Sequence, residues 1–259
     1  MRRDIEQMLT VAKYEIKKYV KGRRVLATVI LIIPISLLAI YFVANTKLTQ
    51  YDFIDDYFMI LTLISAVIGI LYGSDAISSE FAQKTGYVTL AMPVGRVWMG
   101  MGKFLAAAAL ASVSIVIPFA MGVVYMVAVY GSLPSGLLLS LGHLILYGLA
   151  TMSAAFAISA AFSGEVLPVI ISYFVFIIIM PYIEALILAW AIEPWFFLTF
   201  ARKLVPYFSM SPPPPRRVFT TAGVTYSYPR PSVGVAVTIV YLVVGLAIAV
   251  YLFWRKEMK

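Results

Sequence analysis

Long apolar runs separated by short polar segments dominate the chain. Six of these runs approach the roughly 20 residues that a helix needs to cross the hydrocarbon core of a bilayer. They cover residues 25–43, 57–79, 104–129, 137–162, 166–192 and 233–254. The second run is apolar over residues 58–73, and we expect its helix to continue to Ser79. The pattern predicts an all-α integral membrane protein, with a single transmembrane domain of six transmembrane helices over residues 1–259.

Residues 1–24 have a different pattern, in which apolar side chains recur at helical spacing and most lysines lie off that stripe. The stripe consists of Ile5, Met8, Leu9, Ala12, Ile16, Tyr19 and Val20. An apolar stripe beside a cationic face is typical of a helix that lies in the membrane interface. We therefore predict an N-terminal interfacial amphipathic helix. The alternative is a solvated segment that only supplies positive charge.

Composition supports the membrane assignment. Apolar residues make up 62% of the chain and charged residues only 12%, whereas soluble domains carry about 25% charged residues. The net charge is +8, and eight of the twenty basic residues fall within residues 1–24. Cytoplasmic termini would place fourteen of those twenty on the inner side, as the positive-inside rule favours. We expect a multi-pass protein of the cell membrane with both termini cytoplasmic, and no nucleic-acid partner.

Several kinds of chemistry are missing from the sequence. The chain has no cysteine, so disulfides, thiolate metal sites and cysteine nucleophiles are excluded. His143 is the single histidine, and we expect it to have a helix-packing role. Gly102-Lys103 resembles the end of a phosphate-binding loop, but Val97 and Phe104 stand where that motif needs glycine and Ser/Thr. We expect no enzymatic activity and no directly bound cofactor.

Spans three and four are rich in small residues, including the run at 106–109 and Gly148, Ala150 and Ala155. Small residues let helix backbones approach closely in lipid. They indicate either packing within the chain or an interface between subunits.

Glu184 is the conspicuous ionisable residue within the apolar runs. A carboxylate at the bilayer centre costs about 2.5–3.5 kcal/mol on insertion scales, so it usually faces a cavity or a partner. One interpretation is a pathway or gate residue. The other is that Pro181 ends the fifth span, and that Glu184 lies in a re-entrant segment near the outer surface.

Residues 80–103 form a polar loop between spans two and three. Glu80 and Lys84 have the spacing of a helical ion pair. Gly86 is a candidate helix end, and Pro93 a second break. We predict a cytoplasmic helical hairpin with a short helix at its tip, where Tyr87, Leu90 and Met92 would be exposed. Exposed apolar groups rimmed by charge usually bind a partner.

Residues 193–232 form a long outer loop that holds eight of the fourteen prolines. The run 212–215 predicts a stiff polyproline II segment. Aromatic residues at 195–200 predict a short helix that dips into the outer interface. The proline run is either a local elaboration, a contact with an outer partner or a rigid loop.

The residues around the polar loop resemble a known family. Asp75, Ile77, Glu80, Thr85, Gly86, Leu90, Pro93, Arg96 and Lys103 occur in an order similar to that in the first cytoplasmic loop of ABC type-2 transporter permeases. The interfacial helix and six-span layout are also similar. The proline run is not part of the usual pattern of that family.

This resemblance implies the membrane permease subunit of an ATP-driven ABC exporter. The loop would contain the coupling helix, which contacts a separate ATP-binding subunit carrying ATP and Mg²⁺. A second permease subunit, identical or related, would complete the transporter. The residues implied in coupling are Glu80, Phe81, Lys84, Thr85, Gly86, Tyr87, Leu90, Pro93 and Arg96.

Two other functions remain open on the residues alone. An ion-coupled secondary transporter would work without an ATP-binding partner and would depend strongly on Glu184. A non-transporting membrane anchor subunit of an envelope complex would associate tightly with a partner but form no pathway. Substrate identity is not encoded in any motif that we find.

Overall fold

Helices account for nearly all the regular structure of the described chain. The structure is a computed structural model that describes residues 2–22, 24–46, 49–79, 95–220, 223–226 and 228–255. The main helices are α1 (Arg2–Lys21), α2 (Arg24–Thr46), α3 (Gln50–Gly73), α6 (Arg96–Tyr130), α7 (Leu137–Ala161) and α12 (Pro231–Arg255). The fifth span consists of α8 (Val166–Tyr173), a π-helical segment η1 (Phe174–Ile179) and α9 (Met180–Ala189).

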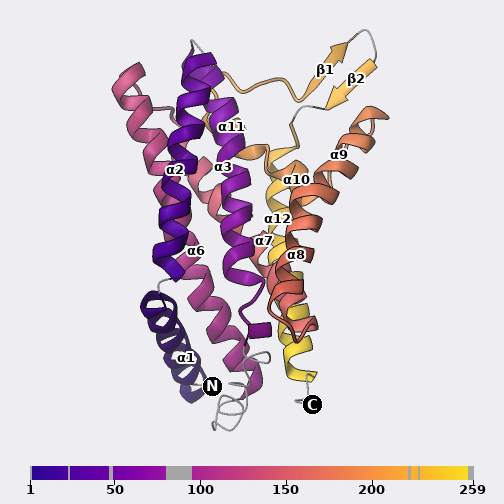
Figure 1. Cartoon of the computed structure of the whole chain (residues 1–259). Coiled ribbons are helices and arrows are strands. Elements are labelled where there is room, and N and C mark those ends of the chain that lie inside the picture. Colours follow the sequence, from indigo (N-terminus) through magenta and orange to yellow (C-terminus); the bar gives the residue numbers. More distant parts are fainter. Residues whose placement is uncertain are drawn as a thin grey trace.

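The predicted all-α membrane fold is confirmed. Within the described residues, six helices are long and apolar enough to cross a membrane. Figure 1 shows both termini at one end of the bundle, which we call the terminus end, and a short hairpin of strands at the other, which we call the hairpin end. α1 runs obliquely beside the lower part of α6 and is not one of the six spans. Its predicted position in the membrane interface stays a prediction.

Two spans begin well before the residues that the apolar pattern indicates. α3 begins at Gln50, where the hydroxyl of Thr49 accepts a hydrogen bond from the backbone N–H of Asp52 and so caps the helix. α6 begins at Arg96 rather than at Phe104. At about 1.5 Å per residue α6 is about 50 Å long, whereas the hydrocarbon core is about 30 Å thick. α6 is therefore longer than the hydrocarbon core is thick.

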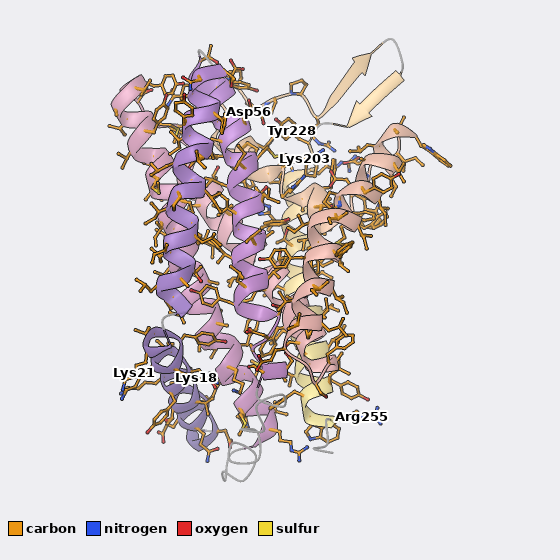
Figure 2. The ribbon with its side chains drawn as sticks, viewed as in Figure 1. Lys18, Lys21, Asp56, Lys203, Tyr228 and Arg255 are labelled. Carbon is orange, nitrogen blue, oxygen red and sulfur yellow. The ribbon has the colours of Figure 1, made fainter. Side chains whose placement is uncertain are left out.

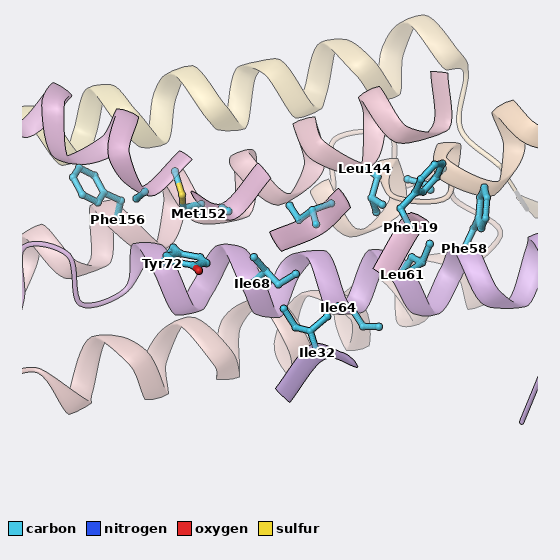
Figure 3. Close-up of a cluster of buried hydrophobic side chains, with 14 of the residues drawn as sticks. Ile32, Phe58, Leu61, Ile64, Ile68, Tyr72, Phe119, Leu144, Met152 and Phe156 are labelled. Carbon is cyan, nitrogen blue, oxygen red and sulfur yellow. The ribbon is translucent and has the colours of Figure 1, made fainter. Parts of the chain in front are cut away.

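α3 lies at the centre of the bundle and packs closely against α7. Figure 3 shows the buried side chains of α3 meeting those of α2, α6 and α7. A side chain at Gly69 would collide with the backbone of Gly148, and one at Gly73 with the backbone of Met152. Ala155 is also fully buried within the chain. The small residues of span four therefore serve packing inside the subunit.

Aromatic residues join α3 to α6 toward the hairpin end. The Tyr57 hydroxyl donates a hydrogen bond to the carbonyl of Pro118 over 2.7 Å. Gly122 leaves room for the Tyr57 ring, and Phe53 stacks on Tyr57 and Tyr125. The contact gives the buried Tyr57 hydroxyl a hydrogen-bond partner and links α3 to the α6 backbone at its proline.

The outer loop contains two short helices and a pair of strands. These elements are α10 (Leu198–Ala201), α11 (Leu204–Ser209), β1 (Arg217–Thr220) and β2 (Gly223–Tyr226). β1 and β2 pair antiparallel, with Arg217 opposite Tyr226, and the sequence pattern does not predict this pair. The Tyr228 hydroxyl donates a hydrogen bond to Asp55 over 2.9 Å and fastens the end of the loop to α3.

Candidate functional site

The predicted coupling loop joins α3 to α6 at the terminus end. Eight of its nine proposed coupling residues lie outside the described residues: Glu80, Phe81, Lys84, Thr85, Gly86, Tyr87, Leu90 and Pro93. Arg96 is described and is the first residue of α6. The predicted hairpin therefore stays a prediction, while the segments that enter and leave the loop can be described in detail.

The entering segment, residues 74–79, is fastened to α7. The hydroxyl of Ser159 accepts hydrogen bonds from the backbone N–H groups of Ile77 and Ser78, at 3.1 and 3.0 Å. Ile77 and Ser78 are completely buried. Because these amides have already left the hydrogen-bond ladder of α3, the serine satisfies them and holds the chain in place.

The leaving segment, the first turns of α6, is fastened to α1 by a buried ion pair. The Lys103 ammonium lies 2.6 Å from the Glu15 carboxylate, and the two side chains are 2% and 13% exposed. Gly102 lies so close to α1 that a Cβ there would be 2.7 Å from the carbonyl oxygen of Met8. The backbones of the two helices therefore approach closely beside a desolvated charge pair.

Two further contacts tie this region together. The Arg96 guanidinium donates a hydrogen bond to the carbonyl of Trp254 over 3.2 Å and joins the start of α6 to the end of α12. The ring of Tyr19 on α1 meets that of Tyr72 on α3 edge to face at 6.0 Å. The two ends of the predicted loop are thus held by α7, α1 and α12. We call residues 74–79 and 95–103, together with their partners Ser159, Glu15 and Trp254, the loop frame.

Positive charge surrounds the loop frame. Figure 2 shows Lys18 and Lys21 on α1 and Arg255 on α12, all at the terminus end and on opposite sides of the bundle. Lys18 also lies 3.8 Å from Glu15, with its side chain 59% exposed. Basic side chains therefore lie on both sides of the loop frame.

Glu184 lies toward the opposite end of the molecule, in an ion pair. Its carboxylate is 3.3 Å from the Lys203 ammonium, and the side chains are 5% and 17% exposed. The interpretation in which Pro181 ends the fifth span is wrong, because the helix continues through Glu184 to Ala189. One carboxylate oxygen of Glu184 has no hydrogen-bond partner. The outer loop, through Lys203, therefore supplies the charge that lets Glu184 be buried.

His143 is buried, as its expected packing role requires. Its Nε2 is 3.0 Å from the carbonyl oxygen of Ala201, which links α7 to α10. In the part of the chain that the structure describes, no three His, Asp or Glu side chains gather in a way that could hold a metal ion.

Three partners in these contacts are not predicted from the sequence: Glu15, Ser159 and Lys203. Glu15 carried a signal, since it lies at helical spacing between Ala12 and Tyr19 on the apolar stripe of α1. An acidic residue on such a stripe needs a partner when the stripe is buried. Ser159 lies among the small residues of span four and Lys203 lies beside Arg202 in the outer loop, so neither stands out from its surroundings as Glu15 does.

Comparison with protein families matches residues 9–258 to the family described as ABC-2 family transporter protein. A comparison with curated proteins finds no match. The family match covers nearly the whole chain, including α3, α6 and the polar loop between them. The six spans of the structure agree with a transmembrane subunit. The chain belongs to the ABC-2 family of transporter proteins, and it is a membrane permease subunit of an ABC transporter.

Proposed function

We propose that this permease is the membrane half of an ATP-driven exporter, and that the loop of residues 80–103 binds a separate ATP-binding subunit. The observation that carries the proposal is the loop frame. Both ends of the loop are anchored to the bundle by buried contacts, through Ser159 at the entrance and Glu15 at the exit. A force applied to a loop held in this way is transmitted to the helices rather than absorbed by slack chain.

α3 and α6 would carry that force across the membrane. α3 is packed against α7 by glycines and against α6 by aromatic rings. A displacement of the loop would therefore move α3 and α6 as packed units, as in rigid-body transitions between two states. Each state would be favoured by different contacts with the ATP-binding subunit.

We also propose an orientation, a location and partners for this subunit. The terminus end would face the cytoplasm, where the basic residues gather, and the protein would lie in the cell membrane. A second permease subunit, identical or related, would complete the substrate pathway. ATP and Mg²⁺ would bind the partner subunit, and this chain would hold no cofactor. The exposed apolar faces of α2 and of the fifth span are available for lipid or for the second subunit.

The proposal can be tested at Glu80 and Gly86, which we expect to contact the ATP-binding subunit. In complexes assembled in membranes, Glu80→Ala and Gly86→Trp should lower co-purification of the ATP-binding subunit and its stimulated ATPase activity. Insertion of the permease into the membrane should be unchanged. Gly164→Trp is the matched control, because Gly164 lies in the connection between spans four and five, at the same end as the loop, with open space around it.

Wild-type co-purification and ATPase activity in the Glu80 and Gly86 variants would contradict docking at the loop. Transport by the permease alone, with no ATP-binding protein present, would favour the ion-coupled alternative. Tight association with a partner that does not hydrolyse ATP would favour the membrane anchor.

A further inference from the structure

An apolar groove lies between α6 and α12 toward the terminus end. It has a volume of about 720 Å³, and its lining residues include Val97, Met101 and Phe104 from α6 and Leu246, Val250 and Trp254 from α12. All of its lining side chains are apolar or aromatic. Val243, Tyr251 and Trp254 in its wall are 58%, 51% and 56% exposed. Such a surface is unfavourable in contact with water.

The end of α12 indicates the level at which the groove lies in the bilayer. Tyr251 and Trp254 occupy the last turn of this helix, directly before Arg255. Tyrosine and tryptophan are enriched at the boundary between hydrocarbon and lipid headgroups. The groove above them therefore lies at the level of acyl chains, in the leaflet on the side of the terminus end.

Two arginines lie at the headgroup end of the groove. The Arg255 guanidinium donates a hydrogen bond to the Tyr251 hydroxyl over 2.9 Å and lies 5.5 Å from the centre of its ring. Arg96 donates to the carbonyl of Trp254, the residue beside Arg255. α6 begins next to them, and Gly95, the residue before it, has no side chain to cap the first amides of the helix. Guanidinium groups and helix amides both favour phosphate oxygens.

We propose that this groove binds one anionic phospholipid of that leaflet. An acyl chain would lie against α6 and α12, and the phosphate would bind Arg255, with Arg96 beside it. The charge pattern selects this occupant, because the cationic groups are confined to the end of an otherwise apolar groove. A lipid held there would join the start of α6 to the end of α12. The proposal does not depend on the proposed exporter function.

The proposal can be tested by quenching of tryptophan fluorescence with brominated lipids. Trp254 lines the groove, so the variant Trp98→Phe, Trp190→Phe, Trp195→Phe makes it the single tryptophan of the chain. The protein is reconstituted in vesicles of dibrominated phosphatidylcholine with or without dibrominated phosphatidylglycerol. We expect phosphatidylglycerol to associate at Trp254 about fivefold more strongly for each arginine that contacts it.

Two pairs of variants distinguish a specific lipid site from nonspecific attraction to basic residues and from ordinary contact of lipid with the protein surface. Arg255→Gln should lower the preference for phosphatidylglycerol about fivefold, whereas Lys21→Gln removes a charge across the bundle and should not change it (Figure 2). Ala247→Phe fills the groove and should reduce quenching by both lipids. Ile239→Phe is the control on the same helix, because Ile239 is 45% exposed outside the groove.

Equal association of both lipids, unchanged in Arg255→Gln, would overturn the proposal and indicate ordinary surrounding lipid. Absence of quenching by either lipid would also overturn it, since a second copy or another protein would then cover the groove. If the single-tryptophan variant does not fold, the composition of the lipid that the purified protein retains is measured instead. Phosphatidylglycerol should be enriched over the vesicle composition in the wild type and not in Arg255→Gln, and no enrichment in the wild type would contradict the site.

Discussion

Lys103 is a buried charge whose partner lies on another helix. Removing one member of a buried ion pair leaves the other desolvated and typically costs about 3–5 kcal/mol. We expect Lys103→Met to lower stability by about 3 kcal/mol, at the low end because Glu15 is 13% exposed. The apparent unfolding temperature of the purified protein measures this loss.

Lys18 offers the matched control, because it lies near the same carboxylate but is 59% exposed. Lys18→Gln should cost less than about 1 kcal/mol, as exposed pairs usually do. The double variant Lys103→Met with Glu15→Leu should recover much of the loss of Lys103→Met, since Glu15 is then not left without its counter-charge. Equal losses for Lys103→Met and Lys18→Gln would show that the buried pair is not what holds α1 on α6.

Glu184 has an ion-pair partner in the structure that its sequence context does not reveal. The sequence identified it as a lone carboxylate, whereas the structure pairs it with Lys203. We expect Glu184→Gln to destabilise the protein by about 3 kcal/mol, because Lys203 would lose the charge it pairs with. Exchanging the two residues, Glu184→Lys with Lys203→Glu, should restore the unfolding temperature.

Recovery of folding without recovery of transport in the exchanged variant would assign Glu184 to the pathway as well. If Glu184→Gln is as stable as the wild type, the ion pair does not stabilise the link between α9 and the outer loop.

Whole helices were predictable from the sequence, but their polar ends were not. Each span carries enough apolar residues to be recognised by length alone. The first turns of α6 were not predicted, because Arg96 and Lys103 are charged residues typical of a loop. In the structure Arg96 forms a hydrogen bond with α12 and Lys103 forms an ion pair with α1. Polar residues at helix ends become predictable only when their partners are known.

The outer loop was the least predictable element. β1 and β2 have four residues each, too few for a reliable alternating pattern. Pairs such as Glu184 with Lys203 and Tyr228 with Asp55 join the loop to transmembrane helices, and no local sequence pattern shows which residues will meet. The residues proposed to contact the ATP-binding subunit came from the family resemblance, and except for Arg96 they lie outside the described residues.

Tyr228 gives a test of how the outer loop is fastened to α3. Burial, followed by the nearby Asp55 and Asp56 carboxylates, raises the pKa of Tyr228 well above its ordinary value. The hydroxyl therefore stays protonated at neutral and mildly alkaline pH and keeps donating to Asp55. Tyr228→Phe should remove a charge-assisted hydrogen bond worth about 1.5–3 kcal/mol, and limited proteolysis of the outer loop should become faster.

Tyr207→Phe is the control for this prediction, because Tyr207 packs its ring on Tyr228 at 5.6 Å and the substitution keeps that ring. Equal proteolysis rates in Tyr228→Phe and the wild type would contradict the fastening role of the hydrogen bond.

The whole molecule divides into a packed centre and an exposed periphery. α3 and α7 are largely buried within the subunit, whereas α2, the fifth span and α12 keep most of their apolar surface exposed. A permease of this kind has room at its periphery for lipid and for a second subunit. Its packed centre leads directly to the loop at the terminus end, where we propose that the ATP-binding subunit binds.

Site-specific photo-crosslinking in membranes is the most direct test of this claim, because it needs no knowledge of the substrate. A photoreactive amino acid in place of Tyr87 should form a crosslink to a protein that binds ATP and carries a phosphate-binding loop. The same group in place of Tyr51, near the hairpin end, should form none. A crosslink to such a protein from position 51, or its absence from position 87 in an active complex, would contradict the account.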